Sequence, residues 1–402
     1  MTIQNRHQGA DLSSRMPDPR SPRSDVLVTI VDADVHVAAR SDSEIAEHLP
    51  EPLRSLSLGR DGSMYFAPSG GMRVDARTSA GPPGSDPEVL YKQLFEDAGV
   101  DYDLLLPLAT GHFPDPEIDA AMKAAANLWL SETWLGRYNW HGRHKGSIWV
   151  AVDNPKSAVR EIERWAGHPH FVQVLVGHHP KSLYGNPQYL PIWEAAARHS
   201  LPVAVHVDSS GYPPVSTAVG FFSHYLEYHS VGHPLVYAAH LTSLICEGVF
   251  DRFPDLHFVM VEGGFSWAGP LIWRMEKNWK ALHGRSAAMK QMPTEYFYNN
   301  VRFTTQPIEE PDESDDLVSL FDIMDASKVL MFSSDYPHWD FDNPKRALPR
   351  LPKGVRELIF HQNAQDLYRL PATRPVDPKP PEQLTHDKGT GDGSTNTDTI
   401  GD

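Results

Sequence analysis

The chain has 402 residues, 40% of them hydrophobic, with a formal net charge of −16 at pH 7 and a single cysteine, Cys246. This length is enough for one large domain or two ordinary ones, and the hydrophobic fraction is enough for a buried core. The acidic balance argues against a nucleic-acid or anionic-membrane partner, because both would require a basic patch. One cysteine excludes an intrachain disulfide and is typical of a reducing compartment.

Both ends of the chain have a composition that predicts disorder. Residues 1–26 are polar and lack the apolar run of a secretory signal, and residues 371–402 are rich in Pro, Gly, Thr and Asp. No stretch approaches the roughly 18 consecutive apolar residues of a membrane span. We therefore predict one folded domain over residues 27–370, no membrane partner and a cytoplasmic location.

The first predicted strand, residues 28–37, carries ionisable side chains. It reads VTIVDADVHV, and a strand sends alternate side chains to opposite faces. Asp32, Asp34 and His36 should therefore share one face of an otherwise apolar strand, where unpaired charge is costly. A bound cation is the simplest partner, because Asp oxygen and neutral His nitrogen both ligate divalent metals. The alternative is a strand end with solvated polar tips.

A long insertion, residues 41–84, follows this strand. It is rich in Pro, Gly and Ser and contains a hairpin-like piece at residues 63–75. So long a segment in a compact domain is usually a lid or a binding loop. Arg73 could pair with a substrate carboxylate from this lid, although a lone Arg in a loop is usually solvated.

The rest of the chain alternates between apolar strands and helical periodicity. With the first strand this makes eight strand–helix repeats over roughly 340 residues, which predicts a parallel sheet closed into a (β/α)8 TIM barrel. An open doubly wound sheet is the alternative. The further strands are predicted at residues 102–109, 146–152, 171–177, 202–207, 257–262, 300–305 and 328–333.

Several of these strands end in polar residues. Buried apolar strands rarely contain His, Glu or Asp without a reason, and a barrel gathers the carboxyl ends of its strands into one site. Their coincidence on the first, fifth, sixth and eighth strands therefore favours a shared metal or catalytic site. The residues are Asp34 and His36 on the first strand, His178 and His179 after the fourth, His206 on the fifth, Glu262 on the sixth and Asp335 on the eighth.

Two further histidines are open to two interpretations. His240, in the helical stretch 234–253, could make a polar contact at the barrel end or pack in the ordinary way. His338, three residues after Asp335, could reach a substrate or cap a loop.

Five sequence motifs, which are specific only when taken together, resemble those of the amidohydrolase superfamily. The branch that the chain resembles contains aminocarboxymuconate-semialdehyde decarboxylase and the dihydroxybenzoate decarboxylases. The resemblance covers about residues 28–370 and implies a metal-dependent enzyme acting on a small carboxylated or aromatic compound. The motifs are DADVH, YGNPQYLPIWEAAARHSLPVAVH, GVFDRFPDLHFVMVEGGFSW, SSDYPHWD and HQNAQDLY.

The resemblance implies a ligand set for one divalent metal ion: Asp34, His36, His206 and Asp335. The first strand of the family usually reads Asp-x-His-x-His, so Asp34 replaces one histidine ligand. Zinc is favoured, with iron or manganese as alternatives because the extra carboxylate suits harder ions. Glu262 stands where the decarboxylases typically carry a histidine acid or base. Relatives are often dimers, so the resemblance is compatible with a homodimer.

The sequence and this resemblance are compatible with two reactions. One is decarboxylation, and the other is metal-dependent hydrolysis of an amide, ester, thioester or C–C bond. The resemblance favours the first, and Glu262, as a base, favours the second. A barrel that binds a chelating ligand without turnover is a non-enzymatic alternative. We assign catalysis to Asp335, Glu262 and His240, and substrate binding to His178, His179, His338 and Arg73.

A serine hydrolase is a rival interpretation. Ser266 follows a predicted strand and precedes a predicted helix, with Asp335 and His361 later in the chain, as in an α/β-hydrolase. However, Ala268 replaces the second Gly of the nucleophile motif, no oxyanion-hole motif is visible, and Asp34 and His36 would have no role.

Overall fold

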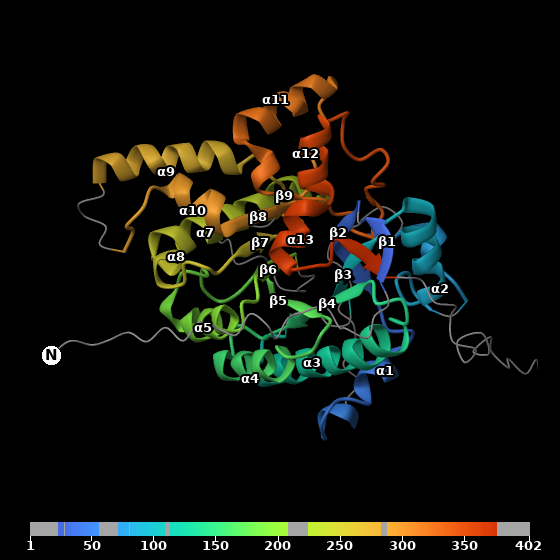
Figure 1. Cartoon of the computed structure of the whole chain (residues 1–402). Coiled ribbons are helices and arrows are strands. Elements are labelled where there is room, and N and C mark those ends of the chain that lie inside the picture. The colour runs from blue at the N-terminus through green and yellow to red at the C-terminus, as the bar shows by residue number, and fades with distance from the viewer. Residues whose placement is uncertain are drawn as a thin grey trace, which may run out of the picture.

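Eight parallel strands follow one another in chain order around a barrel with helices outside it (Figure 1). The computed structural model describes residues 23–27, 29–55, 71–79, 81–108, 113–207, 224–282 and 288–375. The predicted barrel is thus confirmed. Its strands are β2 (Val31–Val37), β3 (Tyr102–Pro107), β4 (His144–Trp149), β5 (Phe171–Gly177), β6 (Val203–His206), β7 (Phe258–Met260), β8 (Val301–Thr304) and β9 (Leu330–Met331).

The barrel closes between its first and last strands through backbone hydrogen bonds. Strand β9 is short, and the segment that follows it continues the pairing with β2. Ala33 N–H donates to the Phe332 carbonyl at 3.0 Å, and Asp335 N–H donates to the Asp34 carbonyl at 3.1 Å. These bonds exclude the open sheet and place Asp34 and Asp335 beside each other.

Helices follow the strands where the periodicity predicts them. Several begin with an Asp or Asn cap followed by Pro, as at Asp115 before α3, where the carboxylate accepts the N–H groups of Glu117 and Ile118. The helices are α1 (Asp42–Ala46), α2 (Pro87–Leu90), α3 (Pro116–Trp129), α4 (Pro155–Trp165), α5 (Leu190–Arg198), α6 (Tyr225–Glu227), α7 (His233–Cys246), α8 (Val249–Arg252), α9 (Ala268–Leu282), α10 (Pro293–Asn300), α11 (Ser314–Met324), α12 (Lys353–Glu357) and α13 (Asn363–Tyr368).

Some helix boundaries differ from the predicted ones. The predicted helix at 234–253 is divided between α7 and α8 at Gly248, whose φ is +71°; a Cβ there would lie 2.6 Å from the Ala288 carbonyl oxygen. Glycine adopts that φ readily and also avoids this close contact. Turns of π-helical geometry extend other helices: η5 (Tyr91–Ala98), η6 (Leu130–Arg137), η8 (Tyr228–Gly232) and η11 (Leu358–Gln362). Helix α10 was not predicted.

Apolar side chains pack on both surfaces of the barrel wall. On the outer surface, the ring of Trp193 on α5 packs edge-on against Phe258 on β7, with the ring centroids 5.1 Å apart. A second cluster includes Tyr102, Val259 and Met331 from three strands. The helices thereby hold the strands, and their carboxyl ends, in a fixed arrangement.

The two ends of the described chain form a small antiparallel sheet, β1 (Arg23–Leu27) with β10 (Thr373–Pro375), coloured blue and red in Figure 1. The prediction of disorder up to residue 26 and from residue 371 is therefore wrong for these segments. Tertiary contacts order them, because the Tyr102 hydroxyl donates to the Thr373 carbonyl at 3.2 Å. The remainder of both terminal segments lies outside the described residues.

Part of the predicted lid is described and lies against the loop after β9. Arg73 N–H donates to the Pro337 carbonyl at 2.9 Å, and Met72 forms an antiparallel bridge with His338. Most of the predicted hairpin at 63–75 lies outside the described residues. Among the described helices, none is both long and apolar enough to cross a membrane.

Candidate metal centre

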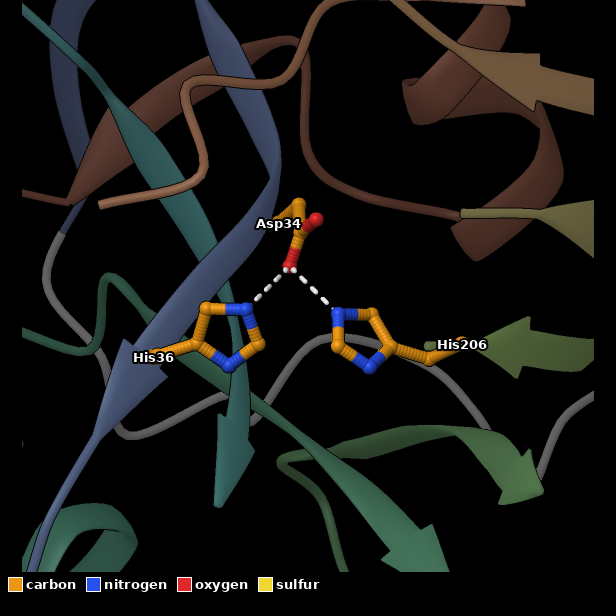
Figure 2. Close-up of side chains that lie close together, drawn as sticks. All are labelled: Asp34, His36 and His206. Carbon is orange, nitrogen blue, oxygen red and sulfur yellow. Dashed lines mark ion pairs between the residues drawn. The ribbon is translucent and has the colours of Figure 1, made fainter. Parts of the chain in front are cut away.

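Donor atoms from three strand ends converge at the carboxyl end of the barrel. Figure 2 shows His36 and His206 on either side of the Asp34 carboxylate. Nε2 of His36 lies 3.2 Å from Oδ1 of Asp34 and 3.1 Å from Oδ1 of Asp335. Nε2 of His206 lies 3.7 Å from Oδ1 of Asp34. The four residues of the predicted ligand set thus lie together.

The atoms that face one another here have no hydrogen-bond partner. Both carboxylate oxygens of Asp34 and Nε2 of His36 and of His206 are buried without one among the described residues. Nδ1 of His36 lies 3.3 Å from the Leu106 carbonyl, to which it can only donate, so Nε2 presents a lone pair to the site. Buried acceptors that face each other fit a cation between them.

The carboxylates of the cluster have opposed pKa shifts. Burial, followed by the charges of Asp335 and Asp32, raises the pKa of Asp34 well above its usual range. Burial also acts to raise the pKa of Asp335, but the neighbouring imidazoles of His338 and His36 outweigh it and hold that pKa low. A divalent cation would compensate both carboxylates, so its binding should release protons.

Glu262 lies beside the cluster, two residues after the end of β7. Its Oε2 is 3.3 Å from Nε2 of His206, and its N–H donates to Oγ1 of Thr304 at 3.1 Å. Burial, then the charges of Asp335 and Asp34, raise the pKa of its carboxyl well above the usual range. Glu262 and Asp335 have φ values of +60° and +58°, which are uncommon for residues other than glycine and concentrate at functional sites.

Asp32 does not join this cluster. The pairing register of β2 and β3 shifts between Asp32 and Val35, so strict alternation does not hold across the motif. Oδ1 of Asp32 accepts the N–H groups of Ser334 at 2.9 Å and Asp34 at 3.3 Å. The side chain therefore ties the first strand to the loop after β9 and positions both Asp34 and Asp335.

His178 and His179 are buried after β5, in contact with a histidine that the sequence analysis did not identify. Nδ1 of His233 lies 3.2 Å from Nε2 of His178. The ring centroids of His178 and His179 are 3.6 Å apart. Burial, followed by the charge of His178, lowers the pKa of His233 well below its usual value. His233 precedes Pro234 at the start of α7, and this helix-start pattern was its only sequence signal.

His240 uses both ring nitrogens in backbone hydrogen bonds. Nδ1 accepts the N–H of Tyr184 at 3.3 Å, and Nε2 donates to the His178 carbonyl at 2.9 Å. The ring also stacks on Tyr184, with the centroids 4.3 Å apart. These contacts give His240 a role in holding the His178 backbone, and they favour the packing interpretation over direct catalysis.

His338 and Arg73 lie at the rim of the site. Nδ1 of His338 is 2.8 Å from Oδ1 of Asp335, and this charge raises the pKa of His338 although burial acts to lower it. The guanidinium of Arg73 bonds to Asp75 at 2.6 Å and lies 4.3 Å from the ring centroid of Phe341. Arg73 therefore has a partner within the lid itself.

The contacts of Ser266 do not resemble a catalytic triad. Its N–H donates to Oε1 of Glu309 at 3.1 Å, whereas Nδ1 of His361 lies 2.7 Å from Oε1 of Gln365. The closed barrel also differs from the open sheet that carries a nucleophile elbow. The structure thus favours the metal interpretation over the serine one.

The barrel and its carboxylate–histidine cluster define the class of metal-dependent barrel enzymes. The chain belongs to the amidohydrolase family, whose sequence pattern matches residues 31–370. This confirms the resemblance found in the motifs.

Among known proteins, the chain is 25% identical over 243 residues to the decarboxylase orsB of Emericella nidulans, covering 55% of this chain and 68% of that protein. The structure is similar to 5-carboxyvanillate decarboxylase of Sphingomonas paucimobilis, with a TM-score of 0.65 and 20% identity over 86% of this chain and 100% of that one. It is also similar to a dihydroxybenzoic acid decarboxylase of Polaromonas sp. JS666 with bound manganese, with a TM-score of 0.63 and 19% identity over 85% and 97% of the two chains.

Proposed function

We propose that this protein is a metal-dependent, non-oxidative decarboxylase of a small aromatic carboxylate. The observation that carries the proposal is the cluster of Asp34, His36 and His206, whose facing atoms are buried without hydrogen-bond partners among the described residues, with Asp335 beside it at 3.1 Å from His36. The decarboxylases among its relatives support this reaction class. The paired carboxylates and the manganese bound in the Polaromonas structure favour manganese over the zinc expected from the sequence.

The reaction breaks one carbon–carbon bond and consumes one proton. The electron pair of the bond to the carboxylate stays on the ring carbon, carbon dioxide leaves, and the ring carbon takes the proton. A bound divalent ion supplies positive charge that holds and polarises the oxygen atoms of an anionic substrate. Asp34, His36 and His206 lie close enough together to hold this ion at the carboxyl end of the barrel, and Asp335, 3.1 Å from His36, is proposed to complete the set.

The Asp335–His338 pair is suited to hold the proton. The 2.8 Å contact between Oδ1 of Asp335 and Nδ1 of His338 orients the imidazole and raises its pKa. A histidine whose ring is oriented by a carboxylate can hold a proton and serve as a general acid. We therefore assign proton delivery to this pair.

Decarboxylation is tested with the purified protein loaded with Mn²⁺ or Zn²⁺ and a panel of hydroxylated benzoates. We expect carbon dioxide and the ring-protonated product in equal amounts, with loss of activity after chelation and recovery when the ion is restored. Product made in deuterium oxide should carry deuterium at the carbon that lost the carboxylate. A loaded protein that cleaves esters or amides and releases no carbon dioxide would overturn the proposal.

Hydrolysis is the second candidate, and Glu262 is the observation that favours it. A carboxyl with a raised pKa beside a metal centre is suited to act as a general base for an attacking water. A parallel panel of esters, lactones and amides, with the Glu262→Gln variant, separates the two reactions. Hydrolysis predicts substrate loss without carbon dioxide and a strong dependence on Glu262.

A further inference from the structure

Trp339 lies at the mouth of the barrel, beside the candidate metal centre. The residue before it, His338, contacts Asp335 at 2.8 Å. The backbone N–H of Trp339 donates to the Gly71 carbonyl of the predicted lid at 3.3 Å. The side chain of Trp339 is 40% exposed, which is high for so large an apolar group. The indole is therefore held next to the site and is accessible to a small molecule that enters it.

The Trp339 indole orients the hydroxyl group of Tyr225, the first residue of α6. Its Nε1–H donates to the Tyr225 oxygen at 3.2 Å. The Tyr225 ring also stacks on His229, with the centroids 5.4 Å apart, and Nε2 of His229 lies 3.5 Å from Oδ2 of Asp340. Two adjacent residues of the loop after β9 thus contact this segment, and together they fix the position of the Tyr225 ring.

The Tyr225 hydroxyl group has a proton to donate. Its oxygen accepts the indole N–H, and no acceptor for its own O–H is found among the described residues. Burial raises the pKa of this phenol to about 12, so the phenol stays protonated near neutrality. The charges of Asp340, Glu262 and Asp335 act in the same direction, so these carboxylates lie within electrostatic reach of the hydroxyl. Tyr225 is therefore a hydrogen-bond donor beside the metal centre.

We propose that Tyr225 binds the substrate by donating a hydrogen bond to a ring hydroxyl oxygen of the aromatic carboxylate, and that Trp339 positions it. The inference rests on the proposed decarboxylase function and names a part of its substrate. The substrate carboxylate is assigned to the metal centre, which leaves a ring substituent as the partner of Tyr225. The acidic residues around the hydroxyl disfavour a second anionic group there. The structure thus favours hydroxylated monocarboxylates over dicarboxylates.

Equilibrium binding of unreactive analogues tests this proposal without turnover. A planar nitro group has the shape of a carboxylate but is not released as carbon dioxide. Isothermal titration calorimetry of the Mn²⁺-loaded protein compares 2-nitrophenol with its derivatives that carry one further ring hydroxyl. We expect one of the added hydroxyls to strengthen binding by about 10-fold, the usual worth of one hydrogen bond. Tyr225→Phe should abolish this gain and leave the affinity for 2-nitrophenol within about twofold.

Two further variants separate substrate binding from packing. Trp339→Phe keeps an aromatic ring but removes the N–H that orients Tyr225, so it should reduce the gain from the added hydroxyl to about threefold. Tyr298→Phe is the matched control. It removes a hydroxyl that donates to the Met324 carbonyl at 3.0 Å, near the amino end of the barrel. The gain should stay within about twofold of that of the unmodified protein.

A gain that persists in Tyr225→Phe would overturn the inference, as would an equal loss of the gain in Tyr298→Phe. The absence of any gain from an added hydroxyl in the unmodified protein would overturn it as well. Thermal unfolding of each variant shows whether it is folded before titration. Failure of the proposed function is distinct: it appears as no carbon dioxide release from hydroxybenzoates by the unmodified Mn²⁺-loaded protein, whatever the binding of the nitro analogues.

Discussion

Buried acids and histidines gather at both ends of the barrel, but they are paired differently. At the amino ends of β3 and β4, the carboxylate oxygens of Asp103 lie 2.8 and 2.9 Å from Nδ1 of His144. Arg143 donates to the Asp101 carbonyl at 2.9 Å and also to that of Val100. Among the described residues at this end, Nε2 of His141 is the exception without a partner.

At the carboxyl end, the same residue types leave their facing atoms unpaired. Both oxygens of Asp34 and Nε2 of His36 and His206 lack hydrogen bonds among the described residues. Burial is equally costly at either end, so the difference lies in what compensates it. At the amino end the protein itself compensates the charge, which serves stability. At the carboxyl end the proposed metal ion would provide this compensation.

The largest expected effect is at the carboxyl end, in Asp335→Asn. Asparagine keeps the shape of the side chain and tolerates the positive φ, but it removes the charge that faces the ion and His338. We expect kcat/KM for decarboxylation to fall by about 1000-fold or more, equivalent to about 4 kcal/mol. Steady-state kinetics and a metal assay check this. Retention of a tenth of the activity would contradict the division of roles between the two ends.

Metal removal should destabilise the carboxyl end selectively. Because the ion binds the folded state, Mn²⁺ at about a thousand times its dissociation constant should add about 4 kcal/mol to the free energy of unfolding. Urea unfolding with Mn²⁺ or with a chelator measures this gain. His206→Ala should abolish it, and a gain that persists in this variant would place the ion elsewhere.

Breaking the pair at the amino end should affect stability and spare activity. Asp103→Ala leaves His144 buried without its partner, so we expect the free energy of unfolding to fall by about 3 kcal/mol. The kcat per folded molecule should stay unchanged. Asp103→Asn, which keeps the shape and an acceptor, is the milder control. A fall in kcat without a loss of stability would assign this end a functional role.

The most gradual effect concerns Asp32, which lies between the first strand and the loop after β9, because it develops only as the pH changes. Burial raises its pKa to about 8, although hydrogen bonds from Ser334 and Asp34 act to lower it. Between pH about 4 and 8 the folded state then holds a proton that the unfolded state releases, so stability falls as pH rises. The slope due to Asp32 is at most about 1.4 kcal/mol per pH unit.

Urea unfolding of the chelated protein from pH 5 to 8 measures this slope. Asp32→Asn mimics the protonated carboxyl, so its unfolding free energy should depend less on pH by up to that amount. Parallel curves for the variant and the unmodified protein would show that Asp32 does not titrate in this range.

Much of the candidate site could be predicted because the carboxyl ends of all strands of a barrel lie at the same end of the molecule. Asp34, His36, His206 and Asp335 are distant in the chain but each stands at a strand end, and closing the sheet brings strand ends together. His233 could not be predicted in the same way, since it lies on a helix and its contact with His178 depends on how α7 packs.

The sequence by itself determined the alternation of strands and helices and which acids and histidines stand at the strand ends, because apolar periodicity reports directly on local structure. Only the tertiary structure decided the partners of those residues. The folded chain shifts the pairing register between Asp32 and Val35. It also leads the His240 ring to accept the backbone N–H of Tyr184 and places Glu262 next to His206. It also ordered β1 and β10, whose composition indicates disorder, by pairing them with each other. These outcomes depend on long-range packing, which a local pattern does not encode.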